Sequence, residues 1–139
     1  MKTGIAILVV SESSLKLSLT IAEHLPGSNL YSSFESIFTD TIPSIATFLK
    51  EHFNRFEAFV FVGSLGICVR SIAPFITDKH TDPAIVNIDS TGKYIVSVLS
   101  GHIGGANSLT KQIARITGGQ AVITTQSDNT DLWALDTLG

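Results

Sequence analysis

The sequence is poor in the residues that crosslinks, metal clusters and membrane spans require. Its 139 residues contain one cysteine, Cys68, which excludes an intrachain disulfide and a cysteine-cluster metal site. The apolar run near the start covers only residues 5–10 (IAILVV), too short for the core of a signal peptide or for a membrane-spanning helix. We therefore expect a cytoplasmic protein with no membrane partner.

Charged residues are also scarce. Asp, Glu, Lys and Arg make up 15% of the chain, against roughly 25% in an ordinary soluble domain. Hydrophobic residues make up 44%, so the composition argues against intrinsic disorder. The formal net charge of −3 provides no basic field to attract nucleic acid. Length and composition together predict one folded domain over residues 1–139.

Short apolar runs alternate with segments of helical spacing along most of the chain. The runs at residues 5–10, 58–62 and 84–88 are typical of strands buried on both faces. Further strands are predicted at residues 30–31, 94–99 and 121–124, and helices at residues 15–25, 43–53, 67–76 and 106–116. Residues 89–93 predict a hairpin between two strands. The fold class is therefore α/β, a three-layer α/β/α arrangement with a mostly parallel, mixed, Rossmann-like sheet.

The end of the sequence continues the pattern. Residues 129–139 read as the opening of another helix, with Leu132, Trp133 and Leu135 as its apolar positions. Because the sequence stops there, we expect this chain to be one module of a larger protein. No pair of His, Cys or carboxylate residues has ligand spacing on one helix face, so we predict no protein-bound metal.

The strongest local signal is the glycine loop, residues 100–107 (SGHIGGAN), between a predicted strand and a predicted helix. Its glycines allow close backbone approach to a ligand, and the helix start favours a carboxylate, a phosphate or a developing oxyanion. His102 suits general acid or base catalysis, and Ser100 and Asn107 can donate hydrogen bonds. A tight turn carrying a solvated histidine is the alternative. The loop lacks the Lys-Ser/Thr of a Walker motif and is not a G-x-G-x-x-G fingerprint.

Other candidate ligand contacts lie at the ends of predicted elements. Gly63 and Gly66 follow the strand at 58–62, and ligands in open α/β sheets bind beyond the carboxyl ends of strands. Arg70 suits a bidentate contact to a carboxylate, with a surface salt bridge as the alternative. Lys79 is either an anion contact or a solvated loop lysine. The last strand is followed by Thr124, Thr125 and Asp128, the last of these a candidate helix cap.

Four sequence blocks occur in an order that resembles one family. They are residues 63–74 (GSLGICVRSIAP), 79–84 (KHTDPA), 99–107 (LSGHIGGAN) and 122–125 (VITT). In this order they resemble the amino-terminal region of the CbiG family of cobalamin-biosynthesis proteins, the cobalt-precorrin-5A hydrolases. The resemblance is strong over residues 58–128 and loose before them. Gln126 and Ser127 depart from the small residues expected ahead of Asp128.

The resemblance implies hydrolytic opening of the δ-lactone of a cobalt corrinoid, with release of acetaldehyde, on the anaerobic route to vitamin B12. It implies no protein cofactor, because the cobalt is carried within the substrate. His102 would be the base, Gly104 and Gly105 the oxyanion donors, and Ser100 and Asn107 the orienting groups. The residues expected to bind the substrate are Gly63, Gly66, Arg70, Lys79, Gly101, Gly104, Gly105, Thr124 and Thr125.

Several alternatives stay open at this point. Family members normally carry a carboxyl-terminal domain, so the isolated domain is expected to need that domain, or another cobalamin-pathway enzyme, as its partner. A non-catalytic module that binds or docks the corrinoid, in a fusion with a precorrin or cobalt-precorrin methyltransferase, is one alternative. The others are a nucleotide- or phosphate-binding domain and a scaffold that forms homo-oligomers.

Overall fold

The described residues fold around a seven-stranded sheet with the strand order β3-β2-β1-β4-β5-β6-β7. A computed structural model describes residues 2–102 and 104–125; Asp128 and the helix expected at residues 129–139 lie outside them. The strands are β1 (Ile5–Val9), β2 (Ser28–Ser32), β3 (Asp40–Thr41), β4 (Ala58–Val62), β5 (Ala84–Ile88), β6 (Tyr94–Leu99) and β7 (Gln120–Val122). The predicted strands are confirmed, except that β7 ends at Val122 and the exposed two-residue strand β3 was not predicted.

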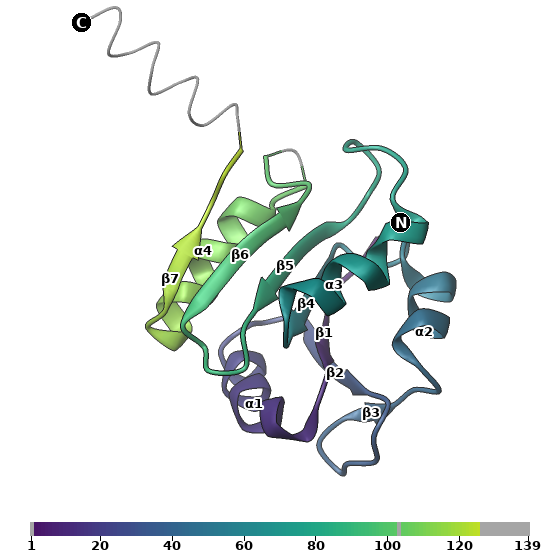
Figure 1. Cartoon of the computed structure of the whole chain (residues 1–139), viewed down its shortest axis with the longest axis vertical. Coiled ribbons are helices and arrows are strands. Elements are labelled where there is room, and N and C mark those ends of the chain that lie inside the picture. The colour runs from purple at the N-terminus through teal and green to yellow at the C-terminus, as the bar shows by residue number, and fades with distance from the viewer. Residues whose placement is uncertain (1, 103, 126–139) are drawn as a thin grey trace, which may run out of the picture.

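The direction of the strands decides where each loop lies. Strands β1 to β5 are parallel, β6 is antiparallel to β5, and β7 is parallel to β6. The predicted mixed, mostly parallel sheet is therefore confirmed. Leu99, the last residue of β6, pairs with Ile85 near the start of β5. The segment that follows β6 thus lies at the amino-terminal edge of the parallel strands, at the top of Figure 1.

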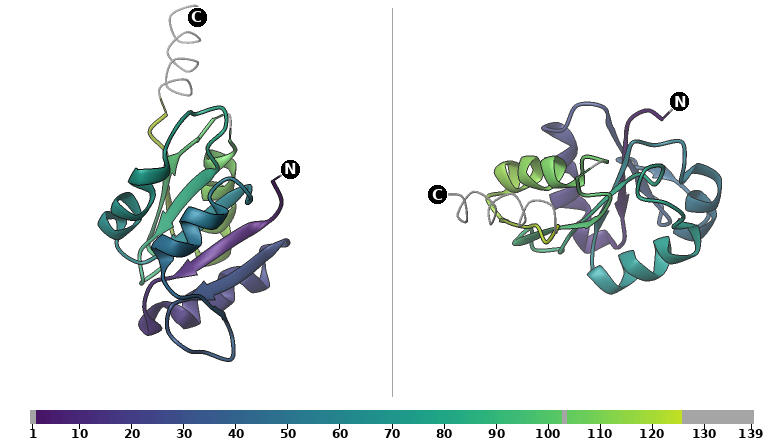
Figure 2. Two further views of the ribbon diagram at one scale, coloured as in Figure 1. Left: turned by 90° about the vertical axis from the view of Figure 1, so that its right-hand side faces the viewer. Right: turned by 90° about the horizontal axis from the view of Figure 1, so that it is seen from above.

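Helices cover both faces of the sheet, which confirms the three-layer prediction (Figure 2). The core under α1 (Leu15–Glu23) and α4 (Ala106–Thr117) contains Val60 and Val62 of β4. The core under α2 (Ile45–His52) and α3 (Leu65–Ile72) contains Phe59 and Phe61. Side chains alternate between the faces of a strand, so a strand covered on both faces is apolar throughout. The short 3₁₀ turns η1 (Glu12–Ser14) and η2 (Ala73–Phe75) flank α1 and α3.

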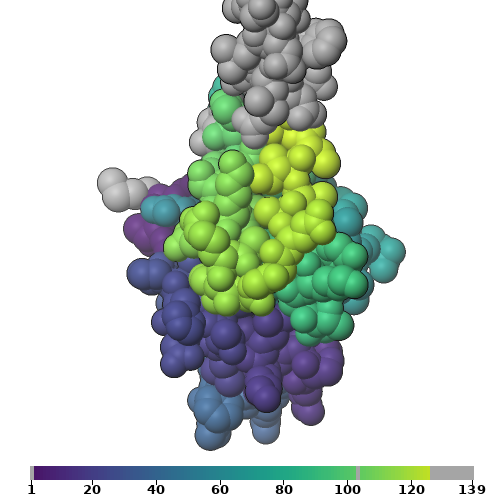
Figure 3. Space-filling model, turned by 90° about the vertical axis from the view of Figure 1, so that its left-hand side faces the viewer, coloured from purple at the N-terminus to yellow at the C-terminus, as the bar shows by residue number. Residues whose placement is uncertain are grey.

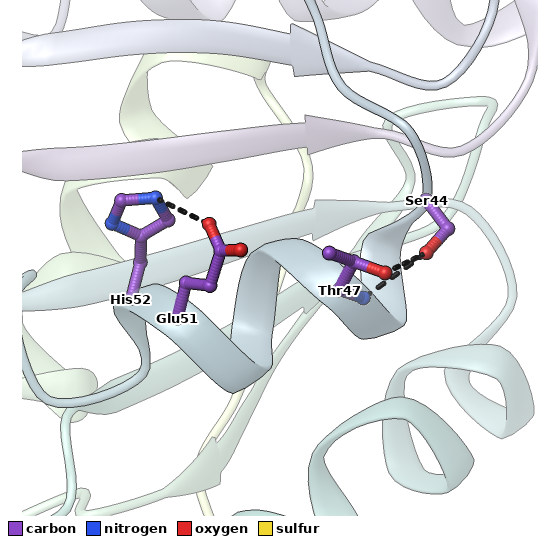
Figure 4. Close-up of polar contacts among 4 residues, drawn as sticks. All are labelled: Ser44, Thr47, Glu51 and His52. Carbon is purple, nitrogen blue, oxygen red and sulfur yellow. Dashed lines mark hydrogen bonds and ion pairs between the residues drawn. The ribbon is translucent and has the colours of Figure 1, made fainter.

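Helix α2 shows how local chemistry sets an element boundary (Figure 4). The Ser44 hydroxyl accepts a hydrogen bond from the backbone N–H of Thr47 at 3.0 Å and caps the helix. Pro43 therefore precedes the cap instead of lying in the first turn, where the sequence had placed it. At the other end, His52 packs against Phe48, with ring centroids 4.6 Å apart, and lies 3.8 Å from the Glu51 carboxylate.

A bulge in β6 adjusts the direction of the chain just before the glycine loop. Ser97 pairs with Val86 and Leu99 pairs with Ile85, so Val98 is an extra residue in β6. The bulge leaves Ser97 directed toward α4 while Leu99 returns to the face covered by α3. It therefore sets the orientation in which the chain enters Ser100.

Candidate functional site

Three of the four sequence blocks meet at the amino-terminal edge of the parallel strands. They are the glycine loop, the segment 76–83 that leads into β5, and the two threonines after β7. Figure 3 shows α4 and residues 120–125 lying side by side on one face of this region. Because β6 and β7 run against the other strands, their carboxyl ends reach the edge at which β5 begins.

Ser100 ties the glycine loop to segment 76–83. Its φ of 59° lies in the left-handed region, which is uncommon for a residue other than glycine. Its hydroxyl donates to the main-chain carbonyl of Asp82 at 3.2 Å. The Asp82 side chain is 4% exposed, and its carboxylate accepts the N–H groups of Thr77 and Asp78 and the Thr77 hydroxyl. Segment 76–83 is thus closed on itself and joined to the loop.

Asn107, in the first turn of α4, holds the glycine loop in place through hydrogen bonds. Its Oδ1 accepts the Ser97 hydroxyl at 2.7 Å, and its Nδ2 donates to Thr125 Oγ1 at 3.0 Å. Its backbone N–H donates to the Gly101 carbonyl at 2.9 Å, and the residue is 7% exposed. A Cβ on Gly101 would lie 2.6 Å from Asn107 Oδ1 and 2.7 Å from Thr125 Cγ2. Gly101 therefore leaves room for the Asn107 side chain, whose hydrogen bonds to Ser97 and Thr125 hold the glycine loop in place.

The start of α4 retains backbone donors for a ligand. Gly105 is the N-cap at φ 88°, and no side chain caps the helix. The N–H of Ala106 donates to the Ser100 carbonyl at 3.2 Å. In the described part of the chain, the N–H groups of Gly104 and Gly105 make no hydrogen bond. A Cβ on Gly104 would lie 2.6 Å from Ser100 Cβ, so the turn requires glycine there too. The N–H groups of Gly104 and Gly105 are therefore candidate donors to an anionic ligand.

A shallow depression of about 250 Å³ lies beside these two glycines. Besides them, its lining comes from α4 and from the starts of the parallel strands: Ile5, Glu57, Ala58, Ala84, Ser108, Leu109 and Gln112. His102 is exposed on the same loop, and Lys79 is exposed on segment 76–83. Thr125 joins the loop through Asn107, and the exposed Thr124 precedes it. The edge thus combines backbone donors, an imidazole and a lysine.

Gly63, Gly66 and Arg70 do not join this group. They lie beyond the carboxyl end of β4, where the chain leaves the strand and enters α3. The length of a five-residue strand, about 15 Å, separates that edge from the glycine loop. A Cβ on Gly63 would lie 3.0 Å from the Val10 side chain, and the Arg70 guanidinium packs over Gly66. These residues have local packing roles, and a contact of Arg70 with the ligand of the glycine loop stays a prediction.

Cys68 has no part in this chemistry. Its side chain is fully buried in α3, and desolvation raises the pKa of its thiol to about 12. A thiol with that pKa is almost entirely protonated near neutral pH, so Cys68 is not a nucleophile. Cys68 is a packed core residue.

Sequence reasoning missed two residues of the site. Ser97 lies in an otherwise apolar strand, where a single hydroxyl facing a helix was a usable signal. Asp82 belongs to the sequence block 79–84, but nothing in the sequence indicated that its carbonyl meets Ser100.

Neither a membrane helix nor a metal cluster occurs in the part of the chain that the structure describes. None of the helices within residues 2–102 and 104–125 has the length and apolarity to span a bilayer. Over the same residues, no three His, Cys, Asp or Glu side chains gather in a way that could hold a metal ion.

Known proteins are similar to this chain in sequence and in fold. The family model described as cobalamin synthesis G N-terminal matches residues 47–128. The cobalt-precorrin-5A hydrolase of Salmonella typhimurium is 47% identical over 89 residues, which are 64% of this chain and 25% of that protein. The cobalt-precorrin-5A hydrolase of Priestia megaterium is 48% identical over 85 residues, 61% of this chain and 23% of that protein.

A solved structure gives the same result. The crystal structure of a cobalamin biosynthesis protein G homolog from Sulfolobus solfataricus superimposes with a TM-score of 0.71 at 27% identity. The match covers 87% of this chain and 36% of that one. The chain thus spans about a quarter of the length of the curated relatives it matches. Because the family match extends over more than half of its residues, this chain belongs to the cobalamin synthesis G N-terminal family.

Proposed function

We propose that this chain forms the glycine-loop part of a cobalt-precorrin-5A hydrolase in cobalamin biosynthesis. Its substrate would be the δ-lactone of a cobalt corrinoid, opened by water with loss of acetaldehyde. One observation carries the proposal. The glycine loop, the segment with Lys79, and Thr125 lie together at the end of the sheet where the parallel strands begin, within residues 47–128 that match the family.

Lactone hydrolysis makes two demands on a site. Water must lose a proton as its oxygen attacks the carbonyl carbon, and the tetrahedral oxyanion must be stabilised before the ring C–O bond breaks. We assign proton removal to His102, which is exposed on the loop. The backbone N–H groups of Gly104 and Gly105 would receive the oxyanion. The proton held by His102 would then pass to the ring oxygen as it leaves as a secondary alcohol. Acetaldehyde would form when this alcohol loses its O–H proton to a base and the bond between its carbinol carbon and the macrocycle breaks. The electron pair of that bond would stay on the macrocycle carbon, which takes up a proton.

Ser100 and Asn107 take a different part in this proposal from the one expected from sequence. Their side chains bond to Asp82, Ser97 and Thr125. They would therefore hold the loop in shape and leave the substrate to the backbone and His102. Lys79, which is exposed at the same edge, would pair with the carboxylate arms of the macrocycle.

The cobalt would arrive inside the substrate, so the proposal includes no resident cofactor. The curated relatives are about four times as long as the region they share with this chain. We therefore assign the rest of the site to a carboxyl-terminal domain of the same protein or to another cobalamin-pathway enzyme. A cytoplasmic location, in keeping with the short apolar run at residues 5–10, is part of the proposal.

The proposal is tested with two proteins: the 139-residue chain, and a chimera in which residues 47–128 replace the matching region of the Salmonella hydrolase. Each is titrated with a cobalt-corrinoid lactone while the visible spectrum and free acetaldehyde are followed. We expect the chain to bind the corrinoid and the chimera to release acetaldehyde. His102→Ala should lower release by the chimera at least about 100-fold.

The matched control removes a histidine elsewhere. His24→Ala changes an exposed histidine at the end of α1, whose ring is hydrogen-bonded to the Thr20 carbonyl of the same helix. Made in the 139-residue chain, this exchange should leave corrinoid binding unchanged. A chimera that folds, binds the corrinoid and keeps full acetaldehyde release after His102→Ala would refute the assignment of the base. Absence of binding by both proteins would refute the function itself.

A further inference from the structure

Segment 76–83 is anchored by one buried carboxylate. Asp82 Oδ1 accepts the Thr77 hydroxyl at 2.9 Å, and Oδ2 accepts the N–H groups of Thr77 at 3.0 Å and Asp78 at 3.2 Å. The N–H of Asp82 also donates to the Asp78 carbonyl at 2.8 Å. These bonds close residues 77–82 into a small ring, with Lys79 and His80 exposed on its outer side.

The same residue reaches the glycine loop through its main chain. The Asp82 carbonyl receives the hydroxyl of Ser100, the residue in the left-handed conformation. Ser100 in turn controls both ends of the loop turn. Its carbonyl accepts the N–H of Ala106, and its Cβ lies where a side chain on Gly104 would have to go. A shift of Asp82 would therefore move the backbone of Gly104 as well as the ring that carries Lys79.

We infer that Asp82 is a positioning residue that joins segment 77–82 and the glycine loop into one unit for binding a carboxylate-bearing substrate. The inference rests on the proposed function for the nature of the substrate. Lys79 alone is a flexible cation, and the N–H groups of Gly104 and Gly105 alone are weak donors. Held at a fixed separation, they can meet a carboxylate arm and the reacting carbonyl of one molecule together. The Ser100–Asp82 bond fixes that separation.

The chain provides a matched control for Asp82. Asp89 makes the same kind of turn between β5 and β6, where its carboxylate accepts the N–H groups of Thr91 and Tyr94 and the Thr91 hydroxyl. That turn follows the carboxyl end of β5, at the opposite edge of the sheet from the glycine loop. Asp89→Asn therefore weakens an equivalent turn without touching the proposed unit.

The first measurement is backbone amide hydrogen exchange of the ligand-free 139-residue chain. We expect Asp82→Asn to accelerate exchange at residues 77–82 and also, at least about five-fold, at Ala106 and Asn107, whose N–H groups bond to the loop carbonyls of Ser100 and Gly101. Ser100→Ala should accelerate the same two groups of amides. Asp89→Asn should accelerate only residues 89–94. Acceleration confined to residues 77–82 in Asp82→Asn would overturn the inference, because the ring would then be independent of the loop.

The second measurement is the Kd of the same chain for a cobalt corrinoid. Asp82→Asn and Ser100→Ala should each raise Kd about ten-fold, while Asp89→Asn leaves it within about two-fold of the wild type. The Kd of the double variant should be no higher than the higher Kd of the two single variants, because both exchanges break the same connection between Asp82 and Ser100. Additive losses would overturn the inference. If Asp82→Asn does not fold, Thr77→Val removes one donor to the carboxylate and replaces it in both measurements.

Failure of the proposed function gives a different result. If the wild-type chain binds no corrinoid, the proposed substrate is refuted. The hydrogen-exchange measurement still decides whether Asp82 couples the two segments.

Discussion

Gly101 offers the sharpest test of the way the glycine loop is held. Exchange to alanine places a Cβ 2.6 Å from Asn107 Oδ1 and 2.7 Å from Thr125 Cγ2. Neither neighbour can move freely, because Asn107 is bonded to Ser97 and to Thr125 and is 7% exposed. Overpacking of this kind costs about 1–3 kcal/mol. Losing the two side-chain hydrogen bonds adds about 1 kcal/mol each.

We therefore expect Gly101→Ala to lower the free energy of unfolding by about 3–5 kcal/mol. The measurement is urea unfolding followed by circular dichroism. Gly66→Ala is the matched control, since a Cβ there meets only the Arg70 guanidinium, at an ordinary 3.6 Å. Gly66 also lies in the first turn of α3, where alanine is favoured by up to about 1 kcal/mol. The two Gly→Ala exchanges should thus differ in sign.

A second variant separates the two obstacles. Thr125→Ser removes the methyl group at 2.7 Å but retains the hydroxyl that Asn107 bonds. In the Gly101→Ala background it should restore part of the lost stability, because the contact with Asn107 remains. If the free energy of unfolding of Gly101→Ala lies within about 0.5 kcal/mol of the wild-type value, Asn107 does not hold the glycine loop in the way described.

Two further predictions concern buried polar groups. Thr110 is fully buried in α4, and its hydroxyl has no hydrogen-bond partner within the described residues. Thr110→Val should therefore raise the free energy of unfolding by about 1 kcal/mol in the same urea assay, and a loss would show that the hydroxyl is bonded. Burial raises the pKa of Cys68 to about 12 from an ordinary value of 9.0, so the folded state holds its proton more tightly. The stabilising contribution is complete below pH 9 and falls between about pH 9 and 12, by up to about 1.4 kcal/mol per pH unit. In Cys68→Ala this part of the decline should disappear, and an unchanged pH profile would contradict the assignment.

The layers of the fold were predictable from local pattern. Residues 58–62 and 84–88 are apolar at every position but Asn87, which only a strand covered on both faces requires, and β4 and β5 occupy those ranges. The glycines of residues 101–105 marked a close turn before a helix, and α4 begins at Ala106. The family blocks were also readable from sequence, because they are runs of residue types in a fixed order.

The arrangement of the site depended on tertiary structure. The hairpin between β5 and β6 was predicted from the sequence, but the residue pattern did not show which loops the hairpin brings together. By reversing β6, it carries Ser100 to the edge where β5 begins, away from Gly63, Gly66 and Arg70. The four sequence blocks, which their order in the chain suggested as one site, are therefore divided between the amino-terminal and carboxyl-terminal ends of the parallel strands.

The contacts that shape the loop were beyond the reach of pattern for a related reason. Residue type gave Ser100 and Asn107 as hydrogen-bonding groups, and the sequence assigned them to a substrate. The bulge at Val98 and the return of β7 instead bring Ser97 and Thr125 to Asn107, and the reversal of β6 brings the Asp82 carbonyl to Ser100. Sequence alone determined which groups are present and which segments are helix or strand. The pairing of distant strands decided which of those groups meet, because a hydrogen bond depends on where two backbones lie in space.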